Sequence, residues 1–152
     1  WYREATLNGF NFRMPNPLAA LGRSQLLRLK EMVIRRQKIA LKYDEIFLKK
    51  KNVILPSYKN LDDISSYQMY VLRLTNDLDK VSVINKLKES GVAASSHFDP
   101  PLHLQKAFKD YLPRISLKNT EIVSSSIISL PMSSSLTDED VNYVVKNIDN
   151  IF

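Results

Sequence analysis

Hydrophobic residues first recur with the period of a helix after Asn16 and Pro17. An asparagine side chain can accept a free N–H of a first helical turn, and proline fits the first helical position. We therefore predict a helix from Pro17 to about Lys50. Apolar residues three, four or seven apart form a stripe along one face of this helix, and only Arg36 interrupts the series. The stripe consists of Leu26, Leu29, Val33, Ala40, Tyr43 and Phe47.

The remaining two thirds of the chain mix short strands with shorter helices. Residues 52–66 contain a short strand, a proline and a polar loop, and residues 67–74 are rich in the aromatic and β-branched residues typical of strands. Asp79 can cap a helix that Gly91 ends. The pattern also predicts a strand at 92–98, short helices at 102–108 and 120–128, a brief strand ended by Pro131, and a last helix after a capping box formed by Thr137 and Asp140.

Length and composition agree with one α+β domain around one core. The chain has 152 residues, of which 44% are hydrophobic and 25% charged, as in ordinary globular proteins. It has no cysteine, which excludes disulfides, thiolate nucleophiles and cysteine-ligated metals and is compatible with the cytoplasm. No apolar run is long enough to span a membrane. Because the sequence begins with Trp1, we expect it to be part of a longer protein.

Positive charge is concentrated in the first third of the chain. Residues 1–51 hold 12 lysines and arginines against 4 acidic residues, whereas residues 52–152 hold 10 against 12. A basic helix can bind nucleic acid, anionic lipid or an acidic partner, or it can simply be solvated. These charges alternate with core-type residues and carry no aromatic side chains spaced for stacking on bases. A solvated face is therefore the favoured interpretation, and binding of nucleic acid is not favoured.

Few residues in the sequence offer site chemistry. Three glycines are too few for a glycine-lined phosphate loop, and the only histidines, His97 and His103, do not have the spacing of metal ligands on a helix. Both lie in the segment HFDPPLH, which is either a packed turn or a rigid loop that presents imidazoles to a ligand. Asn11 and Arg13 are either structural or bind a phosphate. No metal site is predicted.

Three segments, in order, resemble the DegT/DnrJ/EryC1/StrS family of sugar aminotransferases that depend on pyridoxal phosphate. The first, GFNFRMPNPLAALGRSQLLRLKEMVIRRQKIALKYDEIF, resembles the segment after the lysine that carries the cofactor. The second, HFDPPLHLQKAF, resembles a segment of the family with two histidines, and ISLPMSSSLTDEDVNYVVKNI resembles its last strand and helix. The matching residues in the first segment are Gly9, Asn11, Phe12, Arg13, Met14, Ala19, Ala20, Leu21, Gly22, Gln25, Leu26 and Tyr43.

The resemblance implies the small C-terminal domain of a fold-type I transferase. Such a domain has a long N-terminal helix and a small, mainly antiparallel sheet covered by helices. Residues 1–16 would be the end of the large domain and an inter-subunit turn, 17–50 the connecting helix, and 51–152 the small α+β domain. The large domain with the Schiff-base lysine would be absent, so this chain would hold no catalytic residue and would be inactive alone.

The resemblance also implies a function for the whole protein. It would be a cytoplasmic homodimer that transfers an amino group, with glutamate as donor, to a keto nucleotide-sugar for surface polysaccharide or glycan biosynthesis. Asn11 would reach the phosphate of the neighbouring subunit's pyridoxal phosphate, with Arg13 as a second candidate, while His97 and His103 would line the sugar end of the cavity. Phe12 replaces the family's usual tyrosine. The alternative is a non-catalytic dimerisation or regulatory module derived from that family.

Overall fold

The fold is described from a computed structural model. It covers residues 9–10, 12–56, 65–75, 77–108 and 115–152. The chain divides into two compact units, Trp1–Met32 and Val33–Phe152. The domain boundaries expected near residues 16 and 50 stay predictions.

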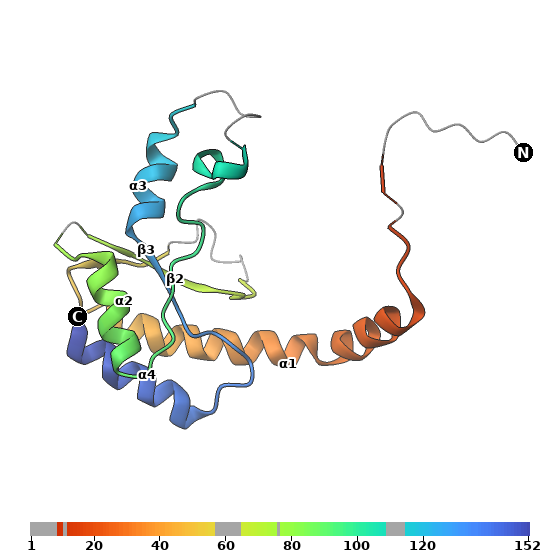
Figure 1. Cartoon of the computed structure of the whole chain (residues 1–152). Helices are drawn as coiled ribbons and strands as arrows, with labels where there is room; N and C mark the ends of the chain where they lie inside the picture. Colours follow the sequence, from red (N-terminus) through yellow and green to blue (C-terminus); the bar gives the residue numbers. More distant parts are fainter. Residues whose placement is uncertain (1–8, 11, 57–64, 76, 109–114) are drawn as a thin grey trace, which may run out of the picture. The chain divides into compact units, whose positions relative to one another are not determined.

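The long predicted helix is present as α1, Asn16–Phe47 (Figure 1). It begins one residue earlier than predicted, because the Ala19 N–H already bonds to the Pro15 carbonyl at 3.0 Å. It ends three residues earlier than predicted, since the N–H groups of Lys49 and Lys50 bond to carbonyls only three residues back. That spacing tightens the last turn and stops the α-helical ladder.

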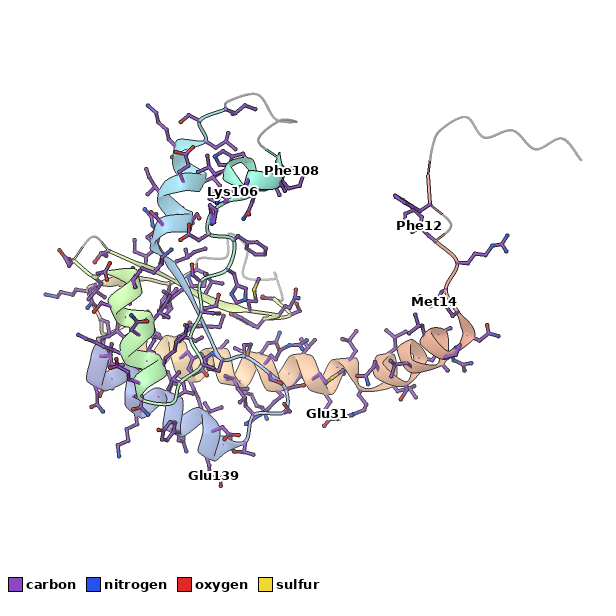
Figure 2. All side chains as sticks on the ribbon, viewed as in Figure 1. Phe12, Met14, Glu31, Lys106, Phe108 and Glu139 are labelled. Carbon is purple, nitrogen blue, oxygen red and sulfur yellow. The ribbon has the colours of Figure 1, made fainter. Side chains whose placement is uncertain are left out.

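Only the second half of the predicted apolar stripe on α1 is buried. Ala40, Tyr43 and Phe47 are almost fully buried, together with Ile39. In the first unit, by contrast, Leu26 is 67% and Leu29 45% exposed. The exposed Phe12 and Met14, in the segment ahead of α1, are labelled in Figure 2. The sheet and the other helices all belong to the second unit, and it is there that the stripe meets a core.

A three-stranded antiparallel sheet forms the centre of the second unit. Its strands are β1 (Val53–Ile54), β2 (Tyr70–Leu74) and β3 (Ile127–Leu130), in the order β1-β2-β3. The register pairs Tyr70 with Leu130 and Leu72 with Ile128. These four side chains share one face of the sheet and are all buried. The expected small antiparallel sheet is confirmed.

Helices α2 (Lys80–Glu89), α3 (Lys118–Ser126) and α4 (Asp138–Ile151) complete the unit, and α2 contacts α4 (Figure 1). The caps predicted at Asp79 and Thr137 are confirmed, whereas Asn16, predicted to cap α1, is its first helical residue. Asp79 accepts the Ser82 N–H at 2.7 Å, and Thr137 forms a capping box with Asp140. Gly91 adopts the left-handed conformation after α2, with φ of 78°. Local sequence therefore sets where these helices begin and end.

Two predicted elements differ in the structure. The strand expected at 92–98 is reduced to one bridge between Ser95 and Ser129. Phe98 has a φ of 61° and two prolines follow it, and neither feature can continue a β-ladder. The helix expected at 102–108 is two short 3₁₀ helices, η1 (Leu102–Leu104) and η2 (Lys106–Phe108). Helix α3 is two residues displaced from its predicted range and leads directly into β3.

A pair of tyrosines joins α1 to the sheet. The rings of Tyr43 and Tyr70 meet edge to face, with centroids 5.0 Å apart. The Tyr43 hydroxyl donates to the Pro131 carbonyl at 2.9 Å, and the Tyr70 hydroxyl donates to Asp44 Oδ1 at 2.5 Å. Burial raises the pKa of both phenols. Burial also raises the pKa of the Asp44 carboxyl, and the Tyr70 hydrogen bond opposes that rise.

We predict that Tyr70→Phe destabilises the second unit by about 2 kcal/mol, the usual contribution of a hydrogen bond to a charged group. The cause is loss of the hydroxyl that bonds to the half-buried Asp44. Urea unfolding at neutral pH measures the loss. Tyr143→Phe is the matched control, because its exposed hydroxyl bonds to the uncharged Ser90 carbonyl and its removal costs less.

The pH dependence of the Tyr70→Phe deficit has a definite sign. As the pH falls from 7 through the raised pKa of Asp44, the carboxylate becomes protonated and the charge-assisted part of the bond disappears. The difference between wild type and variant should therefore shrink in acid. If the variant were less stable than wild type by the same free energy at pH 7 and in acid, a charge-assisted bond would be contradicted.

Candidate functional site

The segment that carries His97 lies along the edge of β3. The backbones of Ser95 and Ser129 exchange two hydrogen bonds, of 3.1 and 2.7 Å. Ser129 is the residue of β3 between Ile128 and Leu130, so its side chain lies on the opposite face of the sheet from theirs. There its hydroxyl is 2.8 Å from His97 Nδ1. The strand register thus positions this imidazole.

His97 is half-buried, and its two ring nitrogens have different surroundings. Nδ1 lies near two serine hydroxyls, that of Ser129 and, at 3.4 Å, that of Ser95. Within the described part of the chain, Nε2 has no hydrogen-bond partner. An imidazole held through one nitrogen can offer the other to a ligand as donor or acceptor. In this arrangement Nε2 is the ring nitrogen that a ligand could reach.

His103 has a different environment, in η1. Its Nε2 lies 3.0 Å from Glu121 Oε1, and only 8% of its side chain is exposed. The same carboxylate oxygen accepts the Leu117 N–H at 2.9 Å, at the start of α3. The hydrogen bond from His103, followed by that from Leu117, lowers the pKa of the Glu121 carboxyl. His103 therefore ties η1 to the first turn of α3.

A cavity of about 490 Å³ lies between the segment that links His97 to His103 and α3. Phe98, Pro101 and Leu102 line one side of it, and Val123 and Ile127 line the other. Its lining is mainly apolar, and neither histidine is part of it. Phe98 is 71% exposed, and sequence reasoning did not select it. An aromatic residue close to a proline pair was the signal that the sequence offered.

The two other candidates lie near the start of the chain. Asn11 falls outside the described residues. Arg13 is exposed in the segment ahead of α1 and belongs to the first unit, whereas both histidines belong to the second. The proposed roles of all four residues stay predictions.

The described residues contain neither a group of metal ligands nor a membrane-spanning helix. Among them, no three histidine, cysteine or acidic side chains are grouped so that they could hold a metal ion. None of the helices in those same ranges combines the length and the apolar composition needed to cross a bilayer.

The three family-like segments thus form α1 with the segment ahead of it, the His97–Phe108 loop, and β3 with α4. The model of the DegT/DnrJ/EryC1/StrS aminotransferase family matches residues 1–149. The chain belongs to this family. The resemblance found in the sequence is confirmed, because the match covers all three segments at once.

Solved structures of aminotransferases have the same fold as this family member. Aminotransferase TlmJ from Streptoalloteichus hindustanus is 29% identical over 99% of this chain, with a TM-score of 0.83. PseC from Helicobacter pylori, an aminotransferase involved in the biosynthesis of pseudoaminic acid, is 27% identical over 98% of this chain, with a TM-score of 0.84. Spr1654 from Streptococcus pneumoniae, in its PMP form, is 26% identical over 88%, with a TM-score of 0.75.

This chain spans only part of the length of these proteins. It covers 40% of TlmJ and of PseC and 34% of Spr1654. The expected fold, the small C-terminal domain of a fold-type I transferase, is confirmed at the level of the α+β architecture shared with these enzymes.

We predict that His103→Ala raises the pKa of Glu121 toward its usual value of 4.5, because the strongest cause of the lowered pKa is removed. The rise is partial, since the Leu117 N–H remains. Carboxyl NMR titration measures it. His97→Ala is the matched control and leaves the pKa of Glu121 unchanged.

The same pair has a consequence for stability. A lowered carboxyl pKa stabilises the fold above the usual pKa, and this contribution is lost as the pH falls through the lowered value. Wild type should therefore lose more stability than His103→Ala between pH 5 and the acid limit of folding. Identical acid unfolding curves would contradict the pairing.

Proposed function

We propose that the protein containing this chain is a cytoplasmic, pyridoxal-phosphate-dependent aminotransferase. In this proposal it transfers the amino group of glutamate to a keto nucleotide-sugar, for surface polysaccharide or glycan biosynthesis, and acts as a homodimer. The observation that carries the proposal is the family match over residues 1–149, together with relatives that are aminotransferases. Spr1654, which has been solved in PLP and PMP forms, supports the choice of cofactor.

The cavity of about 490 Å³ does not by itself fit pyridoxal phosphate. No lysine or arginine is among the residues that line the cavity beside α3. The cavity of about 290 Å³ between α1 and α4 contains three lysines, of which Lys50 is ion-paired with Asp149 at 2.7 Å. The proposal therefore assigns the Schiff-base lysine to a part of the protein outside this chain, and the chain alone is inactive.

Within the proposal, residues of this chain contribute to both ends of the active site. Asn11 donates its amide to the phosphate of the cofactor in the neighbouring subunit, with Arg13 as a second contact. His97 presents Nε2 to the sugar, because its Nδ1 already faces Ser129. His103 acts at the sugar end by holding η1 against α3 through Glu121.

The second candidate function is a non-catalytic dimerisation or regulatory module. One observation favours it. In the first unit, the leucines of α1 are exposed, which leaves an apolar surface available for association: Leu18, Leu21, Leu26, Leu27 and Leu29. Such a module would bind a partner subunit without reacting with an amino donor. The two candidates are separated by spectroscopy of the full-length protein.

We predict that the full-length protein, loaded with pyridoxal phosphate, has a visible absorption band that glutamate decreases and 2-oxoglutarate restores. The bound cofactor supplies the electron sink for amino transfer, and its spectrum changes when it gains or loses the amino group. A panel of UDP- and dTDP-linked keto sugars then identifies the acceptor. A protein that binds the cofactor poorly and does not respond to glutamate would favour the regulatory module.

We further predict that Asn11→Ala in the full-length protein weakens cofactor binding by roughly fivefold, which corresponds to one neutral hydrogen bond of about 1 kcal/mol. Equilibrium titration of the visible band with pyridoxal phosphate measures this change. Asn142→Ala, an exposed amide on α4, is the matched control. Equal dissociation constants for the two variants would exclude Asn11 from the phosphate site.

A further inference from the structure

One lysine lies among charged and polar groups near His97. Lys80, the first residue of α2, has a side chain that is only 12% exposed. Its ammonium donates to Ser96 Oγ at 3.2 Å and to the Ser124 carbonyl at 3.1 Å, and it forms an ion pair with Asp99 Oδ2. The three N–H groups of the ammonium thus match three acceptors.

Asp99 and its neighbour Phe98 are held from a second side by Ser124. The Ser124 side chain is almost fully buried, and its hydroxyl lies 2.9 Å from the Phe98 carbonyl and 3.3 Å from Asp99 Oδ1. Phe98 has a φ of 61°, which aromatic residues rarely adopt. Such a conformation persists where surrounding contacts fix it. Lys80 and Ser124 together provide those contacts, from α2 and α3.

The positions of these contacts along the chain give them a role beyond packing. Ser96 precedes His97, and Asp99 follows it by two residues, so one ammonium holds both sides of the segment that carries the imidazole. From the other side, Ser129 holds His97 Nδ1. Burying a cation costs free energy unless it is fully paired, and an apolar side chain could fill the same space without that cost. Stability alone therefore does not explain the ion pair, whereas its directed contacts are suited to fixing the position of His97.

We propose that Lys80 is a positioning residue for sugar recognition, which acts through Ser96 and Asp99 to hold His97 Nε2 toward the nucleotide-sugar. This inference rests on the proposed function. It adds a residue from α2 that neither the sequence motifs nor the family-like segments include. Lys80 does not touch the substrate, and its removal displaces the imidazole instead of deleting it.

The test uses the full-length protein loaded with pyridoxal phosphate and two readouts. The first is the dissociation constant for UDP-glucose or dTDP-glucose, whichever binds wild type more tightly. The second is the rate of the reaction with glutamate, which does not involve the sugar. Lys80→Met should weaken sugar-nucleotide binding by about tenfold, since a misplaced group loses most of its contribution. The glutamate rate should stay within about twofold of wild type.

Matched variants separate positioning from folding. Lys80→Arg keeps the positive charge and should restore most of the binding, whereas Lys86→Met removes an exposed lysine of the same helix and should change nothing. Should Lys80→Met fail to fold, Asp99→Asn breaks the same ion pair with little change in shape and should weaken binding in the same direction. The inference would be overturned if sugar-nucleotide binding and the rate with glutamate decreased to the same extent in every folded variant.

A double-mutant cycle with His97→Ala gives the decisive result. If Lys80 acts through His97, then Lys80→Met adds no further loss in the His97→Ala background. Additive losses, an unchanged dissociation constant in His97→Ala, or binding of neither probe to wild type would overturn the inference. Failure of the proposed function is a different observation, namely that wild type does not react with glutamate.

Discussion

The antiparallel register of β2 and β3 is the constraint on which the rest of the second unit depends. It places Ile128 and Leu130 opposite Leu72 and Tyr70, so that these four side chains form the centre of the core. It also places Ser129 on the other face, beside His97. A shift of one residue would exchange the two faces of β3, bury the Ser129 hydroxyl in the core and remove the support of the imidazole.

The tyrosine pair keeps that register in place. Tyr70 begins β2 and contacts α1 twice, through the ring of Tyr43 and the carboxylate of Asp44. Tyr43 in turn bonds to the Pro131 carbonyl, directly after β3. Buried polar groups of this kind favour one arrangement, because any other leaves a donor or acceptor unpaired. The two tyrosines therefore fix β2 and the end of β3 against α1.

On the far side of β3, polar contacts and an ion pair position the chain. Lys80 and Asp99 form an ion pair, and His103 bonds to Glu121. Both pairs hold the segment between Ser96 and Phe108 to a helix, the first to α2 and the second to α3. These contacts support the proposal that the segment lines a substrate-binding site.

Sequence reasoning predicted what depends on neighbouring residues. The caps at Asp79 and Thr137 and the stop at Gly91 follow from contacts within three or four positions, and they are confirmed. The prediction of a strand at 92–98 was wrong, because Phe98 and the prolines turn the chain away from β3 after one bridge. Lys80 was missed, since its partners lie 16, 19 and 44 residues away and only the folded chain brings them together.

In the proposed function, the register of β3 positions His97 to meet the sugar of a nucleotide-linked substrate. The most direct test is a crystal structure of the full-length protein with pyridoxal phosphate and a bound nucleotide-sugar. We predict that His97 Nε2 lies within hydrogen-bond distance of the sugar, with Nδ1 still beside Ser129. An imidazole that faces Ser129 but lies far from the bound sugar would contradict it.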